Sequence, residues 1–132
     1  MIEHAYPSKR YQKTHFEEQL TKVVSSIKGN IPRIGINNPK IGNTDGSWRY
    51  CGPSDWVSSF WTGQLWLCYQ ITGDETFKNS AHMRKPYFKE LIVNPNWHDH
   101  DLGFQYSLSC VAGYMLTEDE EYKLMAVEAA HS

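Results

Sequence analysis

The two stretches TGDETFKNSA, residues 72–81, and TEDEEYKLMA, residues 117–126, decide the fold. Six of the ten aligned positions hold an identical or closely similar residue at an offset of 45, and Tyr69 and Tyr114 keep that offset. Each copy follows an apolar run and leads into an amphipathic one, which predicts a tight turn between two helices. A 45-residue repeat of this kind is typical of stacked helical hairpins, as in solenoids and closed α/α toroids. Coincidence is the alternative, because T-x-D-E is a common start for a helix.

The helices around the first turn follow from the same pattern. Gly73 suits the left-handed position that closes a helix, and Asp74 suits the cap of the next one. The run SSFWTGQLWLCYQI, residues 58–71, is apolar on nearly all sides, which predicts a buried helix capped by Ser58 or Ser59.

An amphipathic helix is expected after each turn. In the first copy Pro86 must kink or divide it. In the second copy, residues 103–116 form the apolar helix and a further helix begins after Asp119. The apolar stripe of the first amphipathic helix consists of Phe77, Ala81, Phe88 and Leu91.

The chain before the first hairpin divides into three parts. Residues 1–13 are polar and without period, and we expect an N-terminal arm there. An amphipathic helix then begins at Thr14, which forms a capping box with Glu17, and the GNIP segment at residues 29–32 ends it. Residues 29–55 are rich in glycine, proline and asparagine and predict a long loop with two extended stretches, IPRIGI and SWRYCG.

The length of the chain limits how much of such a fold it can build. At 45 residues a unit, 132 residues hold fewer than three hairpins, whereas a closed ring of six needs about twice as much chain or more. Residues 14–132 are therefore expected to be a partial helical domain, the amino-terminal part of something larger. Apolar helices in so short a chain leave faces uncovered, and self-association through those faces is expected.

Composition excludes several classes of function. The 13 basic and 15 acidic residues give a net charge of -2, which offers no electrostatic footprint for nucleic acid or an anionic membrane. No apolar run reaches the ~18 residues of a transmembrane helix, and MIEHAYPSKR does not read as a secretory signal. Three cysteines without a CxxC motif indicate reduced thiols in a cytoplasmic setting rather than disulfides or a structural zinc site.

All five tryptophans lie between residues 48 and 97. Trp61 and Trp66 are expected in the core of the buried helix. Trp56 precedes that helix beside a carboxylate, where it either packs or stacks on the apolar face of a sugar. Trp48 and Trp97 stay unassigned, on loops that flank the expected cleft.

The segment HDHD at residues 98–101 concentrates ionisable groups at a helix entrance. Three interpretations remain open from the residues alone. His98, His100 and Asp101 could hold a metal. Asp99 or Asp101 could serve only as a helix cap. Asp101 could be a catalytic carboxylate that the imidazole of His100 tunes.

Two motifs resemble a known family. DWVSSFWTGQLWLCYQITGD, residues 55–74, and HDLGFQYS, residues 100–107, resemble the unsaturated glucuronyl hydrolases of glycoside hydrolase family 88. The resemblance implies an all-α fold of stacked helical hairpins, of which this chain would be the amino-terminal part of an (α/α)6 toroid. It also implies hydrolysis of oligosaccharides that carry a 4,5-unsaturated uronic acid at the non-reducing end. In such enzymes a carboxylic acid protonates C4 of the enol ether, water adds at C5, and the hemiketal collapses.

The resemblance also implies roles for single residues. Asp101 corresponds to the first of two catalytic aspartates, His100 to a substrate-binding histidine and Trp56 to the stacking tryptophan. No metal or cofactor is expected. The principal proton donor of the family would lie beyond residue 132, so the chain alone is expected to be inactive. An unsaturated galacturonyl-rhamnose hydrolase and a non-catalytic helical-repeat module that binds sugar or protein are the alternatives.

Overall fold

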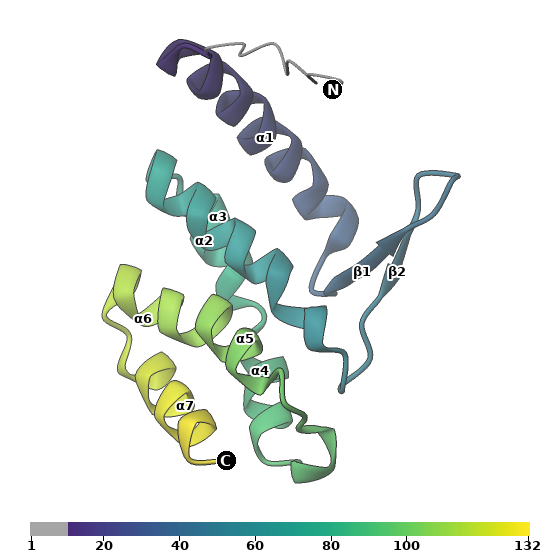
Figure 1. Cartoon of the computed structure of the whole chain (residues 1–132), viewed down its shortest axis with the longest axis vertical. Helices are drawn as coiled ribbons and strands as arrows, with labels where there is room; N and C mark the ends of the chain where they lie inside the picture. The colour runs from purple at the N-terminus through teal and green to yellow at the C-terminus, as the bar shows by residue number, and fades with distance from the viewer. Residues whose placement is uncertain (1–10) are drawn as a thin grey trace, which may run out of the picture.

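The computed structural model describes residues 11–132, and helices dominate this part of the chain (Figure 1). A small antiparallel hairpin separates the first helix from the rest. The expected all-α class with stacked helical hairpins is therefore confirmed, apart from that hairpin. The elements are α1 (Lys13–Ile34), β1 (Pro39–Gly42), β2 (Trp48–Tyr50), the 3-10 turn η1 (Trp56–Ser59), α2 (Phe60–Thr72), α3 (Glu75–His82), α4 (Lys85–Ile92), the 3-10 turn η2 (Pro95–Trp97), α5 (Leu102–Tyr106), the π-helical turn η3 (Ser107–Val111), α6 (Ala112–Thr117) and α7 (Glu120–His131).

The two repeat turns have the same geometry, as their sequences predict. Gly73 closes α2 with φ 67°, and Glu118 takes the equivalent left-handed position with φ 57°. The side chain of Asp74 then accepts a hydrogen bond from the Thr76 amide at 2.9 Å, which caps α3. Asp119 caps α7 in the same way. The structure also repeats the contact in which Lys78 lies over the Tyr69 ring and Lys123 over the Tyr114 ring, at 5.5 and 5.4 Å.

A buried aromatic cluster joins the two hairpins. The ring of Trp66, in α2, meets the edges of His82 and Tyr122, and the His82 and Tyr122 rings stack with centroids 5.6 Å apart. Gly113 lets α6 approach this cluster, because a Cβ there would lie 2.9 Å from the Tyr122 ring. The indole of Trp66 donates to the Ser109 carbonyl at 3.0 Å. The hairpins are therefore stacked as the repeat predicts, and Trp66 is core.

The predictions for the first helix are wrong at both ends. Helix α1 begins at Lys13, its cap residue is Gln12, and Thr14 lies inside the helix and does not form the expected capping box. The helix also continues past residues 29–32 to Ile34, with Pro32 in its last turn. Proline removes one backbone donor there, and the burial of Ile34 offsets that loss. The expected N-terminal arm otherwise lies outside the described residues.

Residues 29–55 are not one long loop. The stretch SWRYCG contains β2, as expected, whereas IPRIGI ends α1 instead of being extended. Arg84, which the sequence does not single out, organises the turn between α1 and β1. Its buried guanidinium donates to the carbonyls of Gly35 and Asn37 at 2.8 Å each. Burial lowers the pKa of Arg84 to about 10.

The helix boundaries around the turn at Pro86 agree with the prediction, because the chain divides into α3 and α4 there. Ser59 stands at the cap position of α2, as expected, but the expected cap hydrogen bond is wrong. Ser59 makes no cap hydrogen bond and instead donates to the carbonyl of Phe104 at 3.3 Å. Cys68 and Cys110 are buried, and both are free thiols. No helix within residues 11–132 is both long and apolar enough to cross a membrane.

Several large apolar side chains of α2, α6 and α7 remain exposed. They are Leu67, Ile71, Met115, Leu124 and Val127. Sequence reasoning expected such uncovered faces, although α2 was expected to be buried on nearly all sides. Self-association through them stays a prediction.

Candidate functional site

Helices α2 and α5 begin close together, at the end of the hairpins opposite the repeat turns (Figure 1). Asp101 occupies the cap position of α5, and His100 precedes it. Trp56 opens η1, which packs against α5. The three residues singled out by the sequence therefore lie on two neighbouring elements.

Asp101 occupies the cap position of α5, but its side chain does not cap the helix. Its backbone carbonyl accepts a hydrogen bond from the Phe104 amide at 2.9 Å, but the side chain makes no cap hydrogen bond. Asp99 shapes the loop instead, because its carboxylate accepts a hydrogen bond from the backbone N–H of Asp101 at 2.8 Å. The cap interpretation is thus correct for the position of Asp101 and wrong for its carboxylate.

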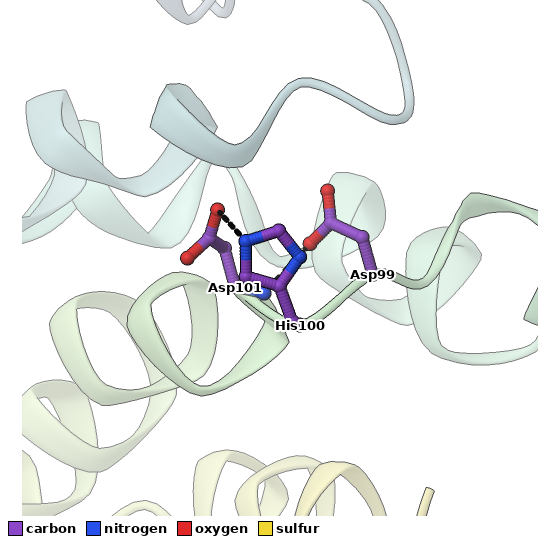
Figure 2. Close-up of side chains that lie close together, drawn as sticks. All are labelled: Asp99, His100 and Asp101. Carbon is purple, nitrogen blue, oxygen red and sulfur yellow. Dashed lines mark hydrogen bonds and ion pairs between the residues drawn. The ribbon is translucent and has the colours of Figure 1, made fainter.

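The imidazole of His100 lies beside that carboxylate (Figure 2), with its Nε2 3.5 Å from Oδ2 of Asp101. The exposed fractions of the two side chains differ sharply, 90% for His100 and 22% for Asp101. Asp101 is therefore a partly sheltered acceptor, while the His100 ring reaches into solvent. A ligand could displace this ring or bind it without disturbing the core.

Trp56 presents an exposed ring. Its exposed fraction is 46%, and its ring approaches Phe60 edge-on, with centroids 5.7 Å apart. Core packing therefore does not account for the whole ring. An exposed indole beside polar groups can cover the apolar face of a sugar.

The backbone that carries Trp56 is tied down on both sides. The carboxylate of Asp55 accepts the Gly52 amide at 2.7 Å and an ion pair from Lys40. Burial alone would raise the pKa of Asp55, but these two hydrogen bonds hold it below its ordinary value. On the other side, the amide of Gln105 in α5 donates to the Asp55 carbonyl at 3.1 Å. Trp56 thus sits in a fixed turn.

The metal interpretation keeps a weaker geometry. One donor atom each from Asp99, His100 and Asp101 can be chosen so that all lie within 4.8 Å of one another. However, these three residues are consecutive, Asp99 and His100 are exposed, and exposed acidic groups gather without a metal in many proteins. His98, one of the three ligands predicted from the sequence, is engaged elsewhere, because its Nε2 lies 2.9 Å from the Leu91 carbonyl oxygen. Nothing in this arrangement favours a metal over a sugar.

A cavity of about 950 Å³ lies between α1 and α2, away from Asp101. Its lining includes Trp48, Phe60 and Trp61, and residues 11–132 contribute no carboxylate and no imidazole to it. Proton transfer to a substrate needs a titratable group within hydrogen-bond reach. The available titratable groups therefore favour the Asp101 end over this cavity as the reactive site, and Trp48 belongs to the cavity.

Sequence reasoning missed the contribution of Gln105. It is buried, and it bonds the turn that carries Trp56 to the helix that Asp101 begins. The available signal was an amide inside the apolar run FQYSLSC, since a polar side chain in such a run needs a buried partner.

Several known proteins are similar to this chain in sequence. An unsaturated glucuronyl hydrolase from Bacillus sp. (strain GL1) is 38% identical over 104 residues, which are 76% of this chain. The chain is a homologue of unsaturated glucuronyl hydrolases. An unsaturated chondroitin disaccharide hydrolase from Streptococcus agalactiae is 32% identical over 93% of the chain. No protein-family model matches.

Solved unsaturated glucuronyl hydrolases share the fold. The crystal structure of the Streptococcus agalactiae enzyme superposes with a TM-score of 0.82 and 32% identity over 92% of this chain. A mutant of that enzyme was solved in complex with dGlcA-GalNAc6S. These structures are helical toroids, which confirms the architecture expected from the repeat and the resemblance.

The match covers only part of each relative. The chain spans 27% of the Bacillus enzyme and 31% of the Streptococcus enzyme. This share agrees with the expectation, drawn from the 45-residue period, of fewer than three hairpins of a larger ring. The roles of Asp101, His100 and Trp56 remain predictions.

Proposed function

We propose that a protein carrying this chain hydrolyses oligosaccharides whose non-reducing end is a 4,5-unsaturated glucuronic acid, such as polysaccharide lyases leave behind. The observation that supports it most is the 38% identity to an unsaturated glucuronyl hydrolase over three quarters of the chain. The site supports it chemically, since a sheltered carboxylate and an exposed indole lie on adjoining elements.

The proposed reaction needs a proton at C4 and a water oxygen at C5. A carboxylic acid donates the proton, water adds to the resulting cation, and the hemiketal opens and releases the remaining sugar. In our proposal Asp101 is one of two carboxylates of this site, and its charge raises the pKa of the acid that donates the proton. Trp56 stacks on a sugar ring, and His100 binds the substrate.

The isolated chain is expected to bind such a disaccharide without turning it over, because the resemblance assigns the proton-donating aspartate to a later helix. The test follows the ultraviolet absorbance of the unsaturated uronate in the presence of the 132-residue chain. Stable absorbance together with saturable quenching of Trp56 fluorescence supports the proposal. Turnover that Asp101→Asn abolishes would contradict the need for a second aspartate.

The substrate class is tested on the full-length protein. Unsaturated glucuronyl and galacturonyl-rhamnose disaccharides are compared, and faster loss of absorbance with the glucuronyl substrate is expected. A preference for the galacturonyl substrate would assign the protein to the alternative hydrolase. Binding without turnover by the full-length protein would favour the non-catalytic module. A cytoplasmic location is part of the proposal, and the free cysteines support it.

A further inference from the structure

One buried amide links the two elements of the candidate site. Gln105 is 1% exposed, and its Nε2 lies 3.1 Å from both the carbonyl oxygen of Asp55 and the hydroxyl oxygen of Ser58. A primary amide has two N–H donors, so this side chain uses both. Asp55 and Ser58 flank Trp56 in the sequence. The Gln105 side chain therefore binds the turn on both sides of Trp56, at the Asp55 carbonyl and at the Ser58 hydroxyl.

The same residue is anchored to Asp101 through the backbone. The backbone N–H of Gln105 donates to the carbonyl oxygen of Asp101 at 3.4 Å, one helical turn away. Residues four apart in a helix lie on the same face. Gln105 therefore connects the helix end that carries the carboxylate to the turn that carries the ring.

A second contact reinforces the first. The hydroxyl of Ser59 donates to the carbonyl of Phe104 at 3.3 Å, so both residues at this point of α5 hold η1. On its outer side, the turn is held by the ion pair between Lys40 and Asp55. The Trp56 ring, by contrast, is exposed. An arrangement that fixes the backbone and exposes the ring suits a preorganised binding surface.

We propose that Gln105 is a positioning residue, which sets the placement of the Trp56 ring relative to the Asp101 carboxylate so that one sugar can contact both. The identity of the sugar in this inference rests on the proposed function. The placement of the Trp56 ring by Gln105 does not, because it can be measured without any sugar.

The test uses the 132-residue chain, with Gln105→Met to remove both donors at similar volume and Gln105→Glu to place an acceptor against the Asp55 carbonyl. Phe77→Leu is the matched control. Phe77, in α3, is as deeply buried as Gln105, and its replacement should lower stability at a place away from this site. Gln70→Met controls for the same chemical change at an exposed glutamine of α2. Each variant is also made with Trp56→Phe, so that the difference spectrum isolates the emission of Trp56.

Two quantities are measured where all variants remain folded: the emission maximum and iodide quenching of Trp56, and the Kd for an unsaturated glucuronyl disaccharide. Both Gln105 variants should shift the Trp56 emission and weaken binding by about tenfold or more. Phe77→Leu should lower the unfolding midpoint and change neither quantity.

A lowered unfolding midpoint with unchanged Trp56 emission and unchanged Kd would show that Gln105 is only structural and would overturn the inference. If no form binds the disaccharide, the proposed function fails on this chain. The Trp56 emission then decides about Gln105 alone, because an unchanged spectrum overturns its positioning role and a shifted spectrum supports it.

Discussion

Asp119 and Asp101 both stand at the start of a helix, but the molecule uses them differently. The carboxylate of Asp119 accepts the Glu121 amide at 3.0 Å and an ion pair from Lys85. The hydrogen bond from Lys85 lowers the pKa of Asp119. The carboxylate of Asp101 has only the His100 ring 3.5 Å away among the described residues.

The difference separates carboxylates that the fold uses from a carboxylate that a ligand can reach. At the repeat turns, aspartate is committed to the helix end and to a lysine from the neighbouring unit, as Asp74 is to Lys28. At the opposite end of the hairpins, Asp101 fills the cap position of α5, but within residues 11–132 its carboxylate contacts only the His100 ring. A substrate can therefore engage Asp101 without competing against a hydrogen bond that the fold needs.

The largest expected effect concerns the aromatic cluster between the hairpins. Tyr122→Ala should lower the free energy of unfolding by about 4 kcal/mol, because it removes a buried ring. Trp56→Ala should change it by less than about 0.5 kcal/mol, since half of that ring is already exposed. Urea denaturation at neutral pH measures both. An equal cost for the two variants would mean that Trp56 is a core residue and not a binding surface.

A smaller effect distinguishes the two caps themselves. Asp119→Ala should cost about 1–2 kcal/mol through loss of the cap. Asp101→Ala should cost less than about 0.5 kcal/mol, because its side chain makes no cap hydrogen bond. Thermal unfolding of the two variants beside wild type provides the comparison. Similar losses would show that the Asp101 carboxylate supports the fold after all.

The smallest effect is the pH dependence of the cluster. Burial lowers the pKa of His82, and the charge of nearby Lys85 lowers it further, while Asp119, on the facing helix, opposes this. Lys78 acts in the same direction as Lys85, and Glu75 acts against it.

Because the folded pKa of His82 lies below the unfolded value of about 6.5, its contribution is complete above that pH and is lost as pH falls through the folded pKa. Asp119 and Glu121 also have lowered pKa values, so their contribution is lost only at more acidic pH, below about 4. Urea titrations between pH 7.5 and pH 5 should show a decline that His82→Gln removes. An unchanged decline in His82→Gln would assign the pH dependence to other groups.

The parts predicted well from sequence are those in which local chemistry sets the structure. Thr72, Gly73 and Asp74 specify a turn through short-range hydrogen bonds and one left-handed residue, so two copies of the pattern predicted two such turns. The cap position of Asp101 was predictable for the same reason. The end of α1 was not, because Pro32 suggests a stop that only the tertiary burial of Ile34 overrides.

Long-range partners explain the remaining misses. Ser58 and Ser59 resemble caps in the sequence, but their hydroxyls bond to α5, some 45 residues away. Arg84 looks like a surface cation until the turn after α1 closes around it. Whether an aspartate at a cap position spends its carboxylate on the cap depends on the backbone of the turn, which the residue type does not determine.

The π-helical turn Ser107–Val111 has a consequence for how the chain tolerates insertions and deletions. Each residue of an α-helix advances the rotation by about 100°. A π-turn holds one residue more than an α-turn over nearly the same rotation, so the extra residue is absorbed within Ser107–Val111 and the flanking helices keep their faces. Deleting one residue here should restore a regular α-helix and leave Gln105 facing η1. The same deletion within α6 should instead rotate the Asp101 end by about 100° relative to the stacked hairpins.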